Sequence, residues 1–214
     1  MSEKTLSKGN NKGIEQVQVY STIGNAAPAL TFIFTMLTMC FWGIYAGIYT
    51  GPTAFAVGIV QLACFVPYSI GAIICYMRGD SMNGNIFLIF AALFGSVGGL
   101  TNIALGLSEI LGFEMNNQMT AIPNIWGAIS LIPLLISYRK VLSATTFLCF
   151  SVVVCFLTLM SLVSLNIIPP TALVNTTITW FCFFVAVSGL YTFFNAMLAI
   201  GGSKPLPEGK PLFK

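Results

Sequence analysis

The chain has 214 residues, of which 57% are apolar and only 7% are charged, and its mean hydropathy is +0.89. A water-soluble domain of this length needs far more charged residues to cover its surface, so the composition excludes an ordinary soluble protein. The formal net charge is only +3. We therefore expect the lipid bilayer to be the surrounding medium, and we expect no nucleic-acid partner.

Six long apolar segments follow a polar start. Residues 1–24 lack a secretory signal peptide and are expected to form a disordered cytoplasmic tail. A membrane-spanning helix needs about 20 apolar residues, and six stretches meet that length. They are Pro28–Tyr49, Ala54–Met77, Ile86–Leu107, Ala121–Tyr138, Val141–Leu165 and Ala172–Ile200. The sequence therefore predicts an all-α integral membrane protein with a six-helix transmembrane domain over residues 25–200 and a cytoplasmic tail over 201–214.

The charges between these segments predict the orientation. All nine Lys and Arg residues lie in the two tails, in the loop after the second segment or in the loop after the fourth. The other three loops carry no Lys or Arg, and their only charged residues are Glu109 and Glu114. Short basic loops stay on the cytoplasmic side of a membrane. Both termini are therefore expected to be cytoplasmic.

No Asp, Glu, Lys, Arg or His lies in the middle of any segment, and the chain contains no His. Proton-driven pumps usually relay protons through buried ionisable side chains, which this chain lacks. Two interpretations remain: a passive channel or uniporter, or a carrier whose proton travels on the substrate, as on a weak acid. Without a carboxylate pair, a His base or a metal-ligand set, we expect no enzymatic activity. The six cysteines have no metal-ligand spacing, so we expect no metal and no cofactor.

The polar residues inside the segments are neutral. Thr31, Tyr68, Tyr191 and Asn195 are candidates for lining an uncharged solute pathway. The alternative is that such side chains bond to neighbouring helices or to their own backbone carbonyls, which is common in membrane helices.

Small residues four positions apart predict close helix contacts. Gly43 and Gly47 form one such pair, and Gly95 and Gly99 form another. This spacing lets two helix backbones approach, because neither glycine carries a side chain.

The first segment has a capped start. Asn25 is a good N-cap residue, and Pro28 suits the first turn because it has no N–H to lose. The end of such a helix carries a partial positive charge that attracts carboxylates. An ordinary helix start has the same features, so on its own this stretch does not establish a binding site.

Several short stretches together resemble the acetate uptake transporter family, which includes the bacterial succinate–acetate permeases and the fungal acetate transporters. The start of the first segment resembles the Asn-Pro-Ala-Pro box of that family, and the likeness extends over nearly all of residues 25–210. The stretches that carry it are Asn25-Ala26-Ala27-Pro28, Arg78-Gly79-Asp80, Lys140-Val141-Leu142, Tyr191 with Asn195-Ala196, and Leu206-Pro207-Glu208-Gly209.

The resemblance implies a homo-hexamer in which each chain has its own pore for acetate and related small carboxylates. It also implies a hydrophobic constriction whose residues fall on Phe34, Phe90 and Leu148, or on Cys149 if the register shifts by one. It places Asn25 and Pro28 on the substrate pathway. The plasma membrane is the expected location of a multi-pass protein of this family.

The chain also departs from the family pattern. Ala26 replaces a Pro of the box, Leu30 replaces a Gly, and Cys75 stands where bacterial members carry an acidic residue. Phe90 replaces a Tyr and so lacks its hydroxyl. These departures leave the choice of substrate open.

The expected function is therefore a membrane transporter or anion channel for acetate and related small monocarboxylates, with or without a proton. Succinate is a further candidate substrate of this family. One alternative is a pathway for ammonium or a neutral small solute. Another is a membrane sensor or scaffold that transports nothing.

Overall fold

The computed structural model describes residues 24–49 and 51–213. The predicted N-terminal tail lies outside the described residues, except for Gly24. All regular elements of the described part are helices, and it contains no β-strand. Six of its helical stretches are long and apolar enough to cross a membrane, which confirms the predicted fold class. The side of the membrane on which the termini lie stays a prediction.

The first, second, fifth and sixth spans are α1 (Ala27–Tyr45), α2 (Thr53–Met77), α6 (Ala144–Ser164) and α7 (Ala172–Ile200). The third span is continuous but composite. It consists of α3 (Ser81–Phe90), a π-helical segment η2 (Ala91–Gly98) and α4 (Gly99–Leu111). A short 3₁₀ turn, η3 (Asn117–Thr120), leads into the fourth span, α5 (Ala121–Tyr138).

Four span boundaries differ from the prediction by three residues or more. The third span ends at Leu111 and not at Leu107, and the fifth begins at Ala144 and not at Val141. The other two differences have a local cause. The first span ends at Tyr45 and not at Tyr49, because Gly47 has φ 70°, a left-handed conformation that stops the helix. The third span begins at Ser81, five residues before the predicted Ile86. The Asp80 carboxylate accepts a hydrogen bond from the Asn83 backbone N–H at 3.1 Å, so this polar first turn is capped and can form.

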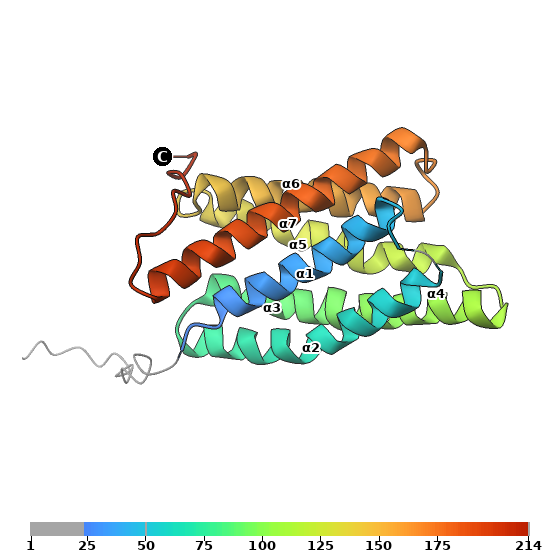
Figure 1. Cartoon of the computed structure of the whole chain (residues 1–214), viewed down its shortest axis with the longest axis horizontal. Helices are drawn as coiled ribbons and strands as arrows, with labels where there is room; N and C mark the ends of the chain where they lie inside the picture. Colours follow the sequence, from blue (N-terminus) through green and yellow to red (C-terminus); the bar gives the residue numbers. More distant parts are fainter. Residues whose placement is uncertain (1–23, 50, 214) are drawn as a thin grey trace, which may run out of the picture.

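The six spans close into a ring. Helix α1 packs against α2 and α7, α2 against the third span, the third span against α5, α5 against α6, and α6 against α7. Figure 1 shows these helices running alongside one another, with the start of α1 and the C-terminus at the same end of the bundle. The loops after α1, α4 and α6 therefore lie at the opposite end, which we call the loop end.

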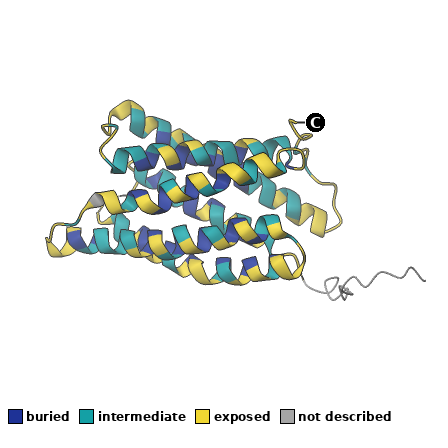
Figure 2. Cartoon of the chain, turned by 180° about the vertical axis from the view of Figure 1, so that it is seen from behind, coloured by how far each residue is buried: buried dark blue, intermediate teal, exposed yellow. Residues whose placement is uncertain are grey.

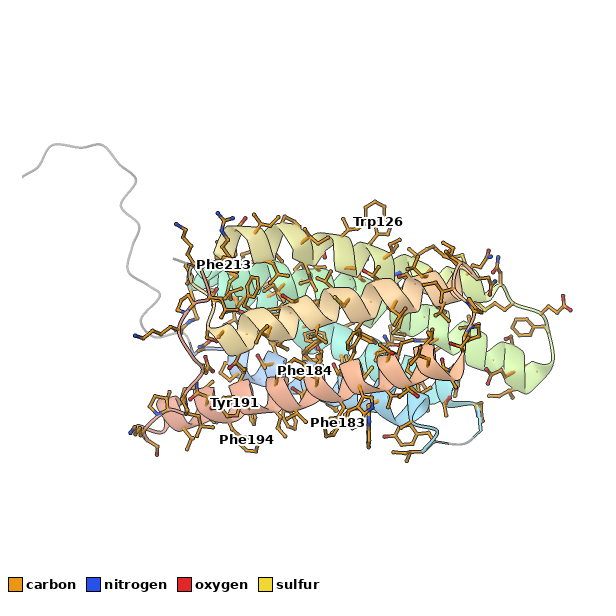
Figure 3. All side chains as sticks on the ribbon, turned by 90° about the horizontal axis from the view of Figure 1, so that it is seen from above. Trp126, Phe183, Phe184, Tyr191, Phe194 and Phe213 are labelled. Carbon is orange, nitrogen blue, oxygen red and sulfur yellow. The ribbon has the colours of Figure 1, made fainter. Side chains whose placement is uncertain are left out.

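The outside of the ring is apolar. Large hydrophobic side chains such as Val66, Ile73, Trp126 and Phe194 are between 52% and 57% exposed. Figure 2 shows the exposed residues gathered at the helix ends and along outward sides, and Figure 3 shows Trp126 and Phe194 projecting from the bundle. Such an exterior suits the hydrocarbon of a bilayer.

Glycines bring the second and third spans into backbone contact. A Cβ added at Gly99 would lie 2.8 Å from the Leu62 backbone N, and one at Gly95 would lie 2.9 Å from the Phe65 Cα. The contact predicted for this pair is therefore confirmed, and it lies within one chain. The contact predicted for Gly43 and Gly47 is wrong, because Gly47 lies in a turn with open space around it.

Candidate solute pathway

A wide cavity opens at the loop end of the bundle. We call it the vestibule; it has a volume of about 480 Å³. Its wall comes from α1, α2, the third span, α5, α6 and the adjoining loops, whereas α7 contributes no residue. The polar residues of this wall are neutral apart from one carboxylate, and they are Tyr45, Thr53, Gln61, Thr101, Asn102, Glu109, Thr120, Asn124, Ser164 and Asn166.

A second, much smaller cavity continues from the floor of the vestibule toward the middle of the bundle. We call it the inner chamber; its volume is about 30 Å³, enough for one or two water molecules. Four residues belong to the walls of both cavities, which places the two end to end. These shared residues are Phe41, Gln61, Phe94 and Asn124.

An aromatic stack forms part of the chamber wall. The rings of Phe34 on α1 and Phe90 on α3 stack with their centroids 5.2 Å apart and their planes at 25°. Phe94 meets the edge of Phe90 at 5.2 Å, and Tyr68 on α2 meets it at 6.3 Å. Three spans therefore meet at Phe90, which is only 1% exposed.

Beyond this stack, toward the end that carries the termini, the bundle is tightly packed. Leu30, Ala72, Cys75 and Phe87 are each at most 4% exposed and belong to the same hydrophobic cluster as Phe90. The vestibule and the chamber thus form a path that is open at the loop end and closed at the Phe34–Phe90 stack.

A pair of amides lies where the two cavities meet. The Asn102 Nδ2 donates a hydrogen bond to the Gln61 Oε1 at 2.6 Å, and Gln61 is only 1% exposed. Gly98 makes room for this amide, since a Cβ there would lie 3.0 Å from the Gln61 Nε2. Asn124 is also buried, and its Nδ2 donates to the Thr120 backbone carbonyl at 3.0 Å. The path therefore narrows through neutral hydrogen-bonding groups.

Tyr68 lies deeper, in the chamber wall. It is 0% exposed, and its hydroxyl is the one buried side-chain oxygen or nitrogen in residues 24–49 and 51–213 that has no hydrogen-bond partner. Buried hydroxyls in native structures are usually paired, so this group is exceptional.

The structure brings together some of the residues predicted from the sequence. Phe34, Phe90 and Tyr68 all line the chamber. Leu148 does not, because it is 48% exposed on the outside of α6. Cys149 is buried but lines neither cavity, and the α6 residues that reach the chamber lie further along the helix, at Val153, Phe156 and Leu157.

The residues predicted at the start of the first span lie away from both cavities. The Asn25 Oδ1 accepts a hydrogen bond from the Ala27 N–H at 3.1 Å, but the N-cap position itself is Ala26, one residue later than predicted. Pro28 is buried in the first turn. The Thr31 hydroxyl donates to the Ala27 carbonyl at 2.9 Å, which matches the alternative of bonding to its own backbone.

Tyr191 and Asn195 bind the C-terminal tail. The Tyr191 hydroxyl donates to the Pro207 carbonyl at 2.8 Å. The Asn195 Nδ2 donates to the Glu208 carboxylate at 2.6 Å, and the Asn195 Oδ1 accepts from the Leu206 N–H. Neither side chain lines the vestibule or the chamber. Figure 3 shows Tyr191 on α7 and Phe213 of the tail in the same half of the bundle.

Sequence reasoning missed Gln61 and Asn124. Each is a lone amide inside a long apolar helix, and that isolation is the signal that could have drawn attention to them. An unpaired amide in hydrocarbon is costly, so a Gln or Asn in mid-span implies a polar partner or a cavity.

The chain matches no known protein family and no curated protein. Its resemblance to the acetate uptake transporters therefore rests on the short stretches of sequence described above. The cavities and the residues that line them are the observations on which a functional argument can be built.

Proposed function

We propose that the protein is a membrane transporter or channel that carries acetate and related small monocarboxylates through each six-helix bundle. Six apolar helices are compatible with such a protein and indicate a multi-pass integral membrane protein. The observation that carries the proposal is the path formed by the vestibule and the inner chamber, which ends at the Phe34–Phe90 stack.

The size and lining of this path favour a transport role over a purely structural role for the bundle. A helix bundle that serves only as a scaffold has no reason to keep a cavity of about 480 Å³ lined by amides and hydroxyls. Below it, the path narrows to apolar rings, and a ring of apolar side chains can act as a gate by excluding water. The arrangement is compatible with a solute pathway in its closed state.

Small monocarboxylates are favoured for two reasons. The sequence stretches that resemble the acetate uptake transporters indicate this substrate class, and the narrow chamber favours the smallest solutes, which need the least movement of its wall to enter. A weak acid can also carry its own proton, so transport coupled to protons would need no ionisable relay inside the spans. Assembly as a homo-hexamer and location in the plasma membrane follow from the same resemblance and belong to this proposal.

The direction of opening follows from the charges. If the basic loops and termini are cytoplasmic, the loop end faces outward. The vestibule then faces outside, and the packed end beyond the aromatic stack faces the cytoplasm. Uptake would require Phe34 and Phe90 to separate.

Two alternatives each have an observation in their favour. Glu109, at the wall of the vestibule, would attract a cation such as ammonium, and the amides suit a neutral solute. The tight packing beyond the Phe34–Phe90 stack favours a sensor or scaffold.

The proposal is tested by uptake of radiolabelled acetate into liposomes that contain the purified protein, at acidic and at neutral pH. Empty liposomes are the control, because undissociated acetic acid crosses lipid unaided. We expect uptake above the control that saturates and that excess propionate reduces. Uptake no faster than in empty liposomes, with an intact oligomer, would favour the ammonium or sensor alternatives.

A further inference from the structure

We infer that Gln61 and Tyr68 on α2 form a two-point binding station for a small uncharged solute that can both donate and accept hydrogen bonds. An undissociated carboxylic acid and a primary amide belong to this chemical class. The inference rests on the proposed function and adds to it the form in which the solute is bound and the residues that bind it.

The position of the two residues supports a station. Gln61 and Tyr68 are seven residues apart, so they lie on the same face of the helix about two turns apart. Gln61 belongs to the wall shared by both cavities, and Tyr68 belongs to the chamber. Helical side chains lean toward the N-terminus, which for α2 is the loop end. Both side chains therefore lean toward an arriving solute.

The Tyr68 hydroxyl has no hydrogen-bond partner in the protein, and a bound solute would supply one. Its ring is held between aromatic neighbours, 6.1 Å from the Phe87 centroid and 6.3 Å from the Phe90 centroid. A residue that served only to pack these rings could be Phe, which would avoid burying an unpaired hydroxyl. Tyr68 instead lines the inner chamber, so a solute bound there could accept a hydrogen bond from its unpaired hydroxyl.

The Gln61 amide is held ready for both kinds of hydrogen bond. The hydrogen bond from Asn102 shows which end of the Gln61 amide is the oxygen. The Gln61 nitrogen lies at the other end and can donate to another group. An amide oxygen can accept a second bond, so Gln61 offers one donor group and one acceptor group. An undissociated acid or an amide matches this pair, whereas a carboxylate anion can only accept.

The charges along the path oppose an anion. Of the described residues that line the vestibule and the chamber, none is Lys, Arg or His, and the one charged residue is Glu109. An anion would pass a carboxylate and then enter an apolar chamber without a positive partner, which is strongly unfavourable. The small chamber also excludes larger solutes, and one with a few heavy atoms requires side chains of its wall to shift.

The test compares three probes of similar size in liposomes that contain the full chain. Acetate can be protonated, acetamide is uncharged, and methanesulfonate stays anionic at every usable pH. We expect acetamide to enter faster than into empty liposomes and to compete with acetate uptake. We expect methanesulfonate neither to enter nor to compete.

Two variants then test the residues. Tyr68→Phe removes only the hydroxyl, and Gln61→Met removes the amide while keeping the length of the side chain. Each should raise the half-saturating concentration of acetamide about three- to tenfold, the effect of one lost hydrogen bond, with a smaller change in the maximal rate. Tyr76→Phe is the matched control, since Tyr76 lies on the same helix but bonds to Asn85 away from both cavities.

The outcomes separate the two proposals. Acetate uptake that methanesulfonate inhibits as strongly as acetamide does would overturn the station and leave transport intact. Unchanged half-saturation in both variants, with normal elution from a sizing column, would also overturn it. If neither acetate nor acetamide enters faster than into empty liposomes, the proposed function and the station both fall. If a variant fails to fold, the comparison of the three probes with the unmodified protein still tests the station.

Discussion

Phe90 is the residue whose replacement should change transport most, because three spans meet at its ring. Phe90→Ala removes the stack with Phe34 on α1 and the edge contact with Tyr68 on α2. Aromatic pairs contribute about 0.5–1.5 kcal/mol each, so the closed state loses about 1–3 kcal/mol. If these contacts break when the path opens, the flux should rise roughly 5- to 150-fold.

The same change has a cost in stability. Truncating a buried Phe to Ala typically costs about 3–5 kcal/mol, so the amount of folded protein must be measured with the flux. The assay is initial uptake of acetate or acetamide into liposomes, normalised to the protein incorporated. Phe194→Ala is the matched control, because Phe194 is 52% exposed on the outside of α7. A folded Phe90→Ala protein with unchanged flux and unchanged selectivity would refute the role of the stack.

Three further predictions concern the helix contacts, the tail and the first helix. Gly99→Ala should lower the melting temperature in detergent, because its Cβ would lie 2.8 Å from the Leu62 N, and an unchanged value would contradict the close contact. Asn195→Ala removes two hydrogen bonds to the C-terminal tail, so a protease that cleaves after Glu should cut after Glu208 faster than in the unmodified protein; equal rates would mean that these bonds do not hold the tail. Asn25→Ala removes the exposed hydrogen bond from the Ala27 N–H, which should cost about 0.5–1 kcal/mol of stability. Transport that falls more than protein abundance would support the entry role that the family resemblance gives Asn25, and an equal fall would limit the residue to a role in stability.

The six spans could be predicted because length and apolarity suffice to recognise a membrane helix. The Phe34 and Phe90 positions came from the resemblance to a family, and the structure places their rings in contact. The sequence of α6 alone could not predict that Leu148 points to the outside of the bundle. That helix is apolar on all sides, so its sequence has no periodicity to show which side points inward.

Other features depend on parts of the chain that are distant in sequence. The roles of Tyr191 and Asn195 depend on the tail folding back along α7, and no local pattern encodes that contact. The buried amide of Gln61 is paired by Asn102, which lies 41 residues away in the sequence. The π-helical segment Ala91–Gly98 arises where Gly95 and Gly98 pack closely on α2, which is a tertiary effect.

The most direct test of the pathway is to block the vestibule chemically. Thr101 lines it beside Asn102, close to the floor, and Thr101→Cys would place a thiol there. A membrane-impermeant, negatively charged thiol reagent should then abolish uptake of acetate and acetamide in this variant and leave the unmodified protein unaffected. Complete labelling of the new thiol, verified by mass spectrometry, with undiminished uptake would contradict the claim that the solute passes through this cavity.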